Sequence, residues 1–174
     1  MNLIVLITGT IPIIIFSWYL SIKHKRYHGI PRFIAFESIF ILALLNYRVW
    51  FQDVFSIHQI ISWILLILSL YLASYGFYLL IRKGNPGANF ENTSKLVKSG
   101  IFGYIRHPLY LSVFLLGMGV LFKDPERIQI ILGIVIFITI IITSLVEERE
   151  MIAKFGDEYK DYMKETKMFI PFIV

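Results

Sequence analysis

Cysteine is missing from all 174 residues of the sequence. Its absence excludes disulfide bonds, thiolate nucleophiles and metal sites built on cysteine. Charged residues are scarce as well: they make up 17% of the chain, whereas 57% of its residues are hydrophobic. With a mean hydropathy of +0.70, the chain is too apolar for a soluble domain of this length. The composition predicts an integral membrane protein.

Several motifs of known chemistry are missing too. The sequence has no H-E-x-x-H metal motif, no serine nucleophile elbow and no phosphate-binding P-loop, and we expect no metal. The formal net charge of +5 does not require nucleic acid, because basic residues also gather in the cytoplasmic loops of membrane proteins. We therefore expect the lipid bilayer, and no nucleic acid, as a partner.

Long apolar runs divide the chain into predicted membrane helices. A helix needs about 20 apolar residues to cross a bilayer, and five runs match or approach this length. Their bounds are 3–22, 33–51, 57–81, 109–122 and 128–146. The prediction is an all-α integral membrane protein with about five transmembrane helices, in which the last two form a hairpin. We expect a single structural domain with three N-terminal helices in 1–81 and the functional region in 82–174.

The fourth run is short, so we expect its helix to begin about one turn earlier. Arg106 and His107 would then lie in its first turn. Pro108 suits that place, because its missing N–H costs least in the first turn of a helix. After the fifth run, apolar side chains recur every fourth residue over 151–163, which predicts an amphipathic helix along the membrane interface. Gly156 followed by Asp157 indicates a helix stop and a new start within this segment.

A polar cluster is predicted where the fourth run begins. The stretch KLVKSGIFGYIRHPLY (95–110) brings Arg106, His107 and a tyrosine to the mouth of an apolar helix. Because the last two runs form a hairpin, Glu147 and Glu148 return to the same membrane face. Polar groups in hydrocarbon need partners. The cluster is therefore either a ligand site or a set of polar side chains that pair with one another and hold the helices together. The chemistry of these groups favours a cofactor with charged and polar parts.

The remaining ionisable groups receive simpler interpretations. The basic loop KHKRYHGIPR (23–32) is interpreted as a topology signal rather than a binding patch, with His24 and His28 in solvent. Glu37 is expected to pair with a cation of this loop. The loops 23–32 and 82–100 are rich in lysine and arginine, and the other two connections are not. The positive-inside rule then places the N-terminus outside and the polar cluster and C-terminus in the cytoplasm.

Two segments in combination resemble the isoprenylcysteine carboxyl methyltransferase family and related phospholipid methyltransferases. They are KLVKSGIFGYIRHPLY (95–110) and EEREMIAKFGDEYKDYM (147–163), and the likeness covers about residues 94–174. The resemblance implies a membrane methyltransferase that uses S-adenosylmethionine at the cytoplasmic face. Its acceptor would be lipophilic, either an isoprenylcysteine-type carboxylate or a lipid headgroup.

The resemblance also implies roles for individual residues. The implied cofactor-binding residues are Leu96, Val97, Phe102, His107, Pro108, Leu109, Tyr110 and Glu147. Arg106 would orient the site or pair with a carboxylate. An amine acceptor would have to lose a proton, and Glu148 or His107 would then accept it. Thr143 would face the substrate, where prenylcysteine-modifying members carry an arginine, and Ser94 stands where a histidine is frequent. Loss of that arginine weakens the case for a prenylcysteine carboxylate.

Two alternatives of other classes stay open at this point. The first is an NADPH-dependent membrane reductase, because sterol reductases have a related C-terminal region that contains the R-H-P sequence. Those enzymes are built from more membrane helices than this chain can hold. The second is a non-enzymatic membrane protein that keeps the fold.

Overall fold

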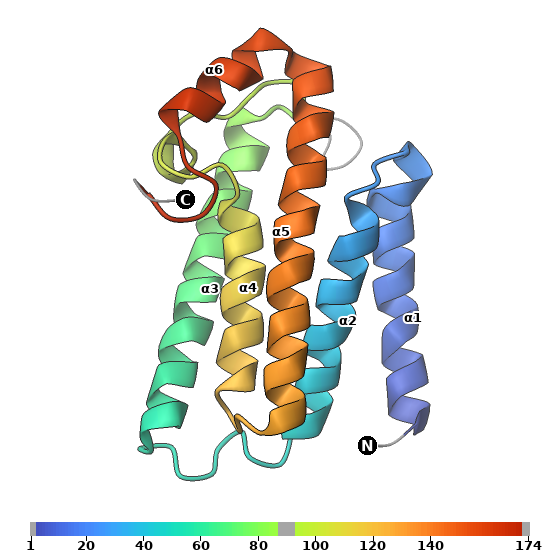
Figure 1. The fold of residues 1–174 in the computed structure, drawn as a ribbon, viewed down its shortest axis with the longest axis vertical. Helices are drawn as coiled ribbons and strands as arrows, with labels where there is room; N and C mark the ends of the chain where they lie inside the picture. Colours follow the sequence, from blue (N-terminus) through green and yellow to red (C-terminus); the bar gives the residue numbers. More distant parts are fainter. Residues whose placement is uncertain (1–2, 87–92, 172–174) are drawn as a thin grey trace.

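The structure is a computed structural model, and it describes residues 3–86 and 93–171. All regular elements of these residues are helices. In chain order they are α1 (Leu3–Leu20), η1 (Ile22–His24), α2 (Gly29–Asn46), α3 (Ile57–Lys83), η2 (Gly100–Gly103), α4 (Pro108–Leu121), α5 (Arg127–Phe155) and α6 (Asp157–Glu165). Figure 1 shows the five long helices running side by side, with α6 crossing one end of the bundle.

The bundle is arranged around α4 and α5. Helix α4 packs against α3 on one side and α5 on the other, α2 packs against α5 and α4, and α1 lies against α2. Helix α6 covers one end of the bundle. The C-terminal ends of α1 and α3 and the N-terminal ends of α2 and α4 all lie at this end (Figure 1). This end, called here the α6 end, therefore collects segments that are distant in the sequence.

The described helices have the lengths and compositions of membrane spans. Four segments are long and apolar enough to cross a membrane: Leu3–His24, Gly29–Asn46, Ile57–Lys83 and Arg127–Phe155. Helix α4 is apolar but has 14 residues, about 21 Å at 1.5 Å per residue, which is shorter than a bilayer core of about 30 Å. The protein is an all-α integral membrane protein with four full-length spans and one shorter apolar helix, which corresponds to the short fourth run of the sequence.

The structure corrects several of the predicted helix bounds. Helix α4 begins at Pro108 and not a turn earlier, so His107 is its N-cap, with φ −121° and ψ 55°. The residue before a proline is disfavoured in the helical region, which stops the helix from extending backward. Helix α2 runs over Gly29–Asn46 instead of 33–51. Its last residue is buried and donates from Asn46 Nδ2 to the Val120 carbonyl at 2.7 Å.

Helix α5 is longer than predicted, so its glutamates lie within the helix and not beyond its end. It continues past Val146 to Phe155, so Glu147 and Glu148 project from a continuous helix. Gly156, at φ +60°, then separates α5 from α6, which confirms the predicted stop at this glycine. The segment 151–163 is therefore not one helix.

Small polar residues allow α3 and α4 to pack closely. Ser62 donates to the Gly119 carbonyl at 2.6 Å, and Ser69 donates to the Ser112 carbonyl at 2.7 Å. A Cβ at Gly119 would lie 2.8 Å from Leu66 Cγ, so a larger residue would push the helices apart. Small residues and interhelical hydrogen bonds replace the hydrophobic effect as the source of packing in a bilayer. These contacts hold α4 closely against α3.

Glu37 has a different partner from the one predicted. Its Oε1 accepts a hydrogen bond from Thr10 Oγ1 at 2.7 Å, which links α2 to α1 inside the bundle. The expected ion pair with the basic loop is not formed by this oxygen, because the first turn of α2 directs the loop toward α5. Glu37 therefore connects α1 to the bundle and lies apart from the polar cluster.

Candidate functional site

A cavity of about 470 Å³ lies at the α6 end of the bundle, lined by residues of all six α-helices and of the 93–107 segment. All eight residues implied to bind a cofactor line it: Leu96, Val97, Phe102, His107, Pro108, Leu109, Tyr110 and Glu147. Arg106 lines it as well. Glu148 and Thr143 belong to the described residues but are not among those that line the cavity. The fold thus brings the separated halves of the predicted site to one place.

An ion pair joins the start of α4 to α5. Arg106 Nε lies 2.7 Å from Glu148 Oε1, and both side chains are less than one-tenth exposed. Two backbone carbonyls, at Met163 within α6 and at Thr166 just after it, accept further hydrogen bonds from Arg106 Nη1. A charge-assisted pair of this kind, supported by further hydrogen bonds from the same guanidinium, holds both groups in one geometry. The predicted convergence of Arg106 and Glu148 is confirmed.

His107 lies between two glutamates. Its Nε2 is 3.2 Å from Glu148 Oε1 and its Nδ1 is 3.5 Å from Glu147 Oε2. The ring stacks on Tyr110 with centroids 5.5 Å apart. Burial disfavours the imidazolium, but hydrogen bonds and charge from both carboxylates outweigh it and raise the pKa of His107 above its ordinary 6.5. The carboxylates therefore favour a protonated imidazole at the cavity wall.

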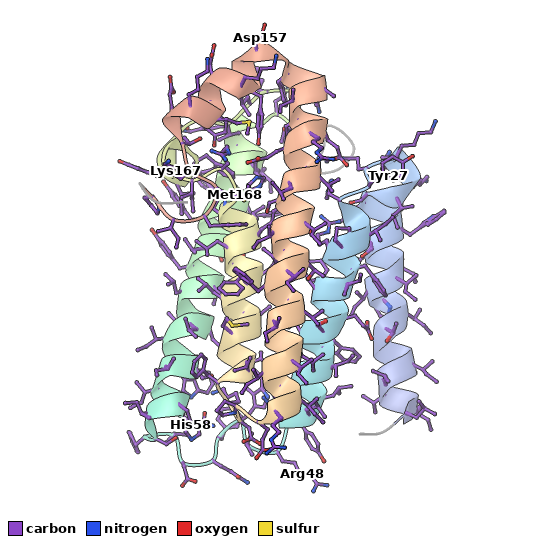
Figure 2. All side chains as sticks on the ribbon, viewed as in Figure 1. Tyr27, Arg48, His58, Asp157, Lys167 and Met168 are labelled. Atoms are coloured by element: carbon purple, nitrogen blue, oxygen red, sulfur yellow. The ribbon has the colours of Figure 1, made fainter. Side chains whose placement is uncertain are left out.

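The C-terminal segment fixes the backbone of this stretch. The amides of Arg106 and His107 donate to the carbonyls of Lys167 and Met168 at 2.8 and 3.2 Å, and the Lys167 amide donates to Tyr104 at 3.1 Å. Figure 2 shows Lys167 and Met168 at the α6 end. Tyr162 of α6 adds a hydrogen bond from its hydroxyl to the Phe102 carbonyl at 2.6 Å. Nothing in the local sequence predicts this pairing, because its partners are about sixty positions apart.

The basic loop between α1 and α2 also reaches the cluster. Arg26 Nη2 lies 3.4 Å from Glu147 Oε1, and its Nε lies 3.2 Å from Glu150 Oε2. His28 is fully buried, and its Nδ1 is 2.8 Å from Glu150 Oε2. The prediction of a solvated His28 is wrong, whereas His24 is exposed. The loop therefore supplies site residues and does not act only as a topology signal.

One sequence signal could have found these contacts. Glu147 and Glu150 are three residues apart, so they share one face of α5 and repel each other unless cations lie between them. Arg26 takes that position. The loop's composition alone cannot show it, because solvated basic loops of membrane proteins look the same.

Part of the cavity lining is apolar. Side chains from α1, α2, α3 and α4 supply this part, namely Phe16, Phe36, Ala73, Phe77, Leu109 and Val113, and Arg32 of α2 lies beside the rings of Phe16 and Phe36. Thr143 stands apart, because it is fully buried and its hydroxyl donates to the Thr139 carbonyl at 2.6 Å. The cavity therefore has both charged lining residues and an apolar surface that can contact a hydrocarbon chain.

The segment between α3 and α4 approaches the cavity from the side. Its two ends are paired, since the Lys95 amide donates to the Gly84 carbonyl at 3.1 Å. Gly100 has φ +64°, and a Cβ there would lie 2.7 Å from Leu79, so glycine is required at this turn. The turn leads into η2, which presents Phe102 to the cavity. Residues 87–92 of this connection lie outside the described residues.

The first prediction concerns the Arg106–Glu148 pair. Glu148→Gln leaves a buried arginine without its counter-charge, and we expect a loss of about 3 kcal/mol of unfolding free energy. The matched control is Glu158→Gln, whose exposed pair with Lys98 (3.1 Å) should contribute less than about 1 kcal/mol. Denaturant unfolding in detergent measures both, and equal losses would contradict the structural role of the buried pair.

The second prediction is a dependence on pH. Because the folded-state pKa of His107 is raised, its protonation stabilises the fold fully below pH 6.5, and this contribution is lost as pH rises through the raised pKa. The melting temperature of the wild type should therefore fall over that interval, and His107→Gln should flatten the fall. His24→Gln, at an exposed histidine, serves as the control. Identical pH profiles for the wild type and His107→Gln would refute the assignment.

Comparisons with known proteins agree with this geometry. The family model described as phospholipid methyltransferase matches residues 57–158, which include α3, η2, α4 and the whole of α5. No solved structure matches the chain.

Curated relatives are methyltransferases by name. A methanethiol S-methyltransferase of Crocosphaera subtropica is 31% identical over 81 residues, which cover 45% of this chain and 30% of that protein. Protein-S-isoprenylcysteine O-methyltransferases of Schizosaccharomyces pombe and Mus musculus are 33% and 28% identical, over 45% and 91% of this chain. The chain covers 34% and 65% of those two proteins. Because the family model covers more than half of its residues, the chain belongs to the phospholipid methyltransferase family.

Proposed function

We propose that this protein is a membrane-embedded methyltransferase that uses S-adenosylmethionine and acts on a lipophilic acceptor. The observation that carries the proposal is the cavity itself. Its lining combines Arg106, His107 and Glu147 with apolar side chains of the membrane helices. Membership of the family supports the same reaction class. The acceptor classes under consideration are an isoprenylcysteine-type carboxylate and a lipid headgroup.

The residues present fit the chemistry of this cofactor. S-adenosylmethionine carries a sulfonium, an ammonium, a carboxylate, ribose hydroxyls and a flat purine. Glu147 suits its cationic groups, and Arg106 and protonated His107 suit its carboxylate. Leu96, Val97 and Phe102 offer an apolar wall for the purine. When bound, the cofactor supplies an activated methyl group.

The protein's own contribution is to position groups and to exclude water. Methyl transfer is a direct displacement, so alignment of the acceptor with the methyl group supplies much of the acceleration. Arg106 and Glu148 hold His107 through a buried ion pair and a hydrogen bond. Glu148 is a positioning residue in this proposal, because it contacts Arg106 and His107 and does not line the cavity. Tyr110 and Leu109 continue the wall from the charged end toward the apolar surface.

The third prediction is direct binding. Calorimetric titration of the detergent-purified protein with S-adenosylmethionine and S-adenosylhomocysteine should give saturable binding. His107→Ala and Glu147→Ala should each weaken it by about tenfold or more, since each removes a charge-assisted contact. Glu158→Ala, at an exposed glutamate of α6, should bind as the wild type does.

Gel filtration and melting curves check that each variant is folded. Absence of binding by the folded wild type would refute the proposed cofactor. Saturable binding of NADPH in its place would assign the cavity to a reductase.

We also propose that the α6 end faces the cytoplasm. The basic residues of the loop at 23–32 gather at this end, together with those of the segment that precedes α4. Tyr27 lies at the α6 end and Arg48 at the opposite end (Figure 2). An excess of lysine and arginine near span ends favours a cytoplasmic location.

The fourth prediction tests this orientation. Because the chain has no cysteine, single-cysteine variants report on one position each. Tyr27→Cys, at a residue 64% exposed, should resist a membrane-impermeant maleimide in intact cells and react after lysis. Phe55→Cys, 90% exposed near the other end, should react in intact cells. The reverse pattern would overturn the proposed orientation.

A further inference from the structure

We propose that the hydroxyl of Tyr159 is a further binding group for the methyl donor, and that it forms a hydrogen bond with the amino-acid end of that molecule. The inference rests on the proposed function, because it concerns the cofactor of the same cavity. Tyr159 belongs to α6, and no residue of this helix is among the cofactor-binding residues that the resemblance implies. Helix α6 would therefore take part in binding as well as covering the end of the bundle.

Helix α6 presents two tyrosines to the cavity. Tyr159 and Tyr162 are three positions apart, so they share one face of the helix, and both line the cavity. They are the buried residues of α6, and each is 3% exposed. Their rings meet edge to face, with centroids 5.7 Å apart. Through this face, α6 forms part of the cavity wall.

The hydroxyls of the two tyrosines differ in what they contact. The Tyr162 hydroxyl donates to the Phe102 carbonyl at 2.6 Å, so it serves the fold. The Tyr159 hydroxyl has no hydrogen-bond partner within residues 3–86 and 93–171, although this side chain is equally buried. Buried polar groups nearly always have a partner, and one that lacks it is costly. Because Tyr159 lines the cavity, a molecule bound there can supply the missing partner.

The charges near Tyr159 indicate which part of the methyl donor it meets. The carboxylates of Glu147 and Glu148 and the guanidinium of Arg106 act electrostatically on this phenol. Glu147 and Arg106 also line the same cavity, and they are the residues proposed for the ammonium and the carboxylate of the cofactor. A hydroxyl beside them meets the amino-acid end of the molecule and not the purine.

The phenol of Tyr159 is neutral in this environment. Burial raises the pKa of its hydroxyl above the ordinary value, and the negative charges of Glu147 and Glu148 raise it further, against the opposing effect of Arg106. The hydroxyl therefore keeps its proton, and it can donate to a carboxylate or accept from an ammonium. It supplies a hydrogen bond without changing the net charge of the site, which suits a ligand end that carries both signs of charge.

The fifth prediction compares Tyr159→Phe with Tyr162→Phe, which each remove one hydroxyl and keep the ring. Calorimetry on the full chain in detergent measures the binding of S-adenosylhomocysteine and of methylthioadenosine, a nucleoside thioether without the amino-acid end. We expect Tyr159→Phe to bind S-adenosylhomocysteine about tenfold more weakly than the wild type does, as a hydrogen bond to a charged group predicts. Its affinity for methylthioadenosine should equal that of the wild type.

Thermal unfolding without ligand separates binding from folding. Tyr159→Phe should keep the melting temperature of the wild type, because the lost hydroxyl has no hydrogen-bond partner within the described residues. Tyr162→Phe should lower the melting temperature, because it loses the hydrogen bond to the Phe102 carbonyl. The matched control is Tyr71→Phe, at a tyrosine of α3 that is 61% exposed. It should equal the wild type in both measurements.

Three results would overturn the role of Tyr159 and leave the proposed function in place. The first is wild-type affinity for S-adenosylhomocysteine in Tyr159→Phe. The second is an equal loss of affinity for methylthioadenosine, which would place the hydroxyl at the nucleoside. The third is a fall in melting temperature as large as that of Tyr162→Phe, which would assign the hydroxyl to the fold. Absence of S-adenosylhomocysteine binding by the folded wild type would refute the cofactor itself, and the role of Tyr159 with it.

Discussion

The need to pair charges at the edge of a membrane organises the α6 end of this protein. Arg106 and His107 precede an apolar helix, and neither can be left unpaired there at low cost. Glu148 contacts both of them from α5. This contact sets the start of α4 against α5, and the C-terminal segment then fixes the backbone of Arg106 and His107.

The same pairing extends outward from the centre. Glu147 contacts His107 on one side and Arg26 on the other. Glu150 continues the series to Arg26 and the fully buried His28. One face of α5 thus connects α4 to the loop between α1 and α2. The shape of the cavity depends on these contacts, because they determine where α2 stands relative to α4.

A site built in this way has two environments within one cavity. Charged groups from the start of α4 and from α5 line one part of the cavity, and rings from α1, α2 and α3 line another part. A charged cofactor and a lipophilic acceptor need both environments, because the cofactor requires polar and charged partners and the acceptor requires an apolar surface. Electrostatic contacts also become stronger where water is excluded. The arrangement explains how a chain with few charged residues can concentrate them where the reaction is proposed.

The sequence by itself determined the membrane class, the helical runs and the meeting of Arg106 and His107 with Glu147 and Glu148. Hydrophobic run length fixes spans, and a hairpin brings its two ends to one membrane face. These rules use local sequence alone, and they were sufficient to predict that these four side chains lie close together. The stop at Gly156 followed equally from local residue chemistry.

Only the tertiary structure decided what lies around that centre. Arg26, His28 and Arg32 read as a solvated basic loop, yet two of them contact α5 more than 110 positions away and the third lines the cavity. Thr143, implied by resemblance, turns to its own helix and not to the cavity. The cause is the same in each case. A side chain's partner depends on how helices are rotated and packed, and composition does not record that rotation.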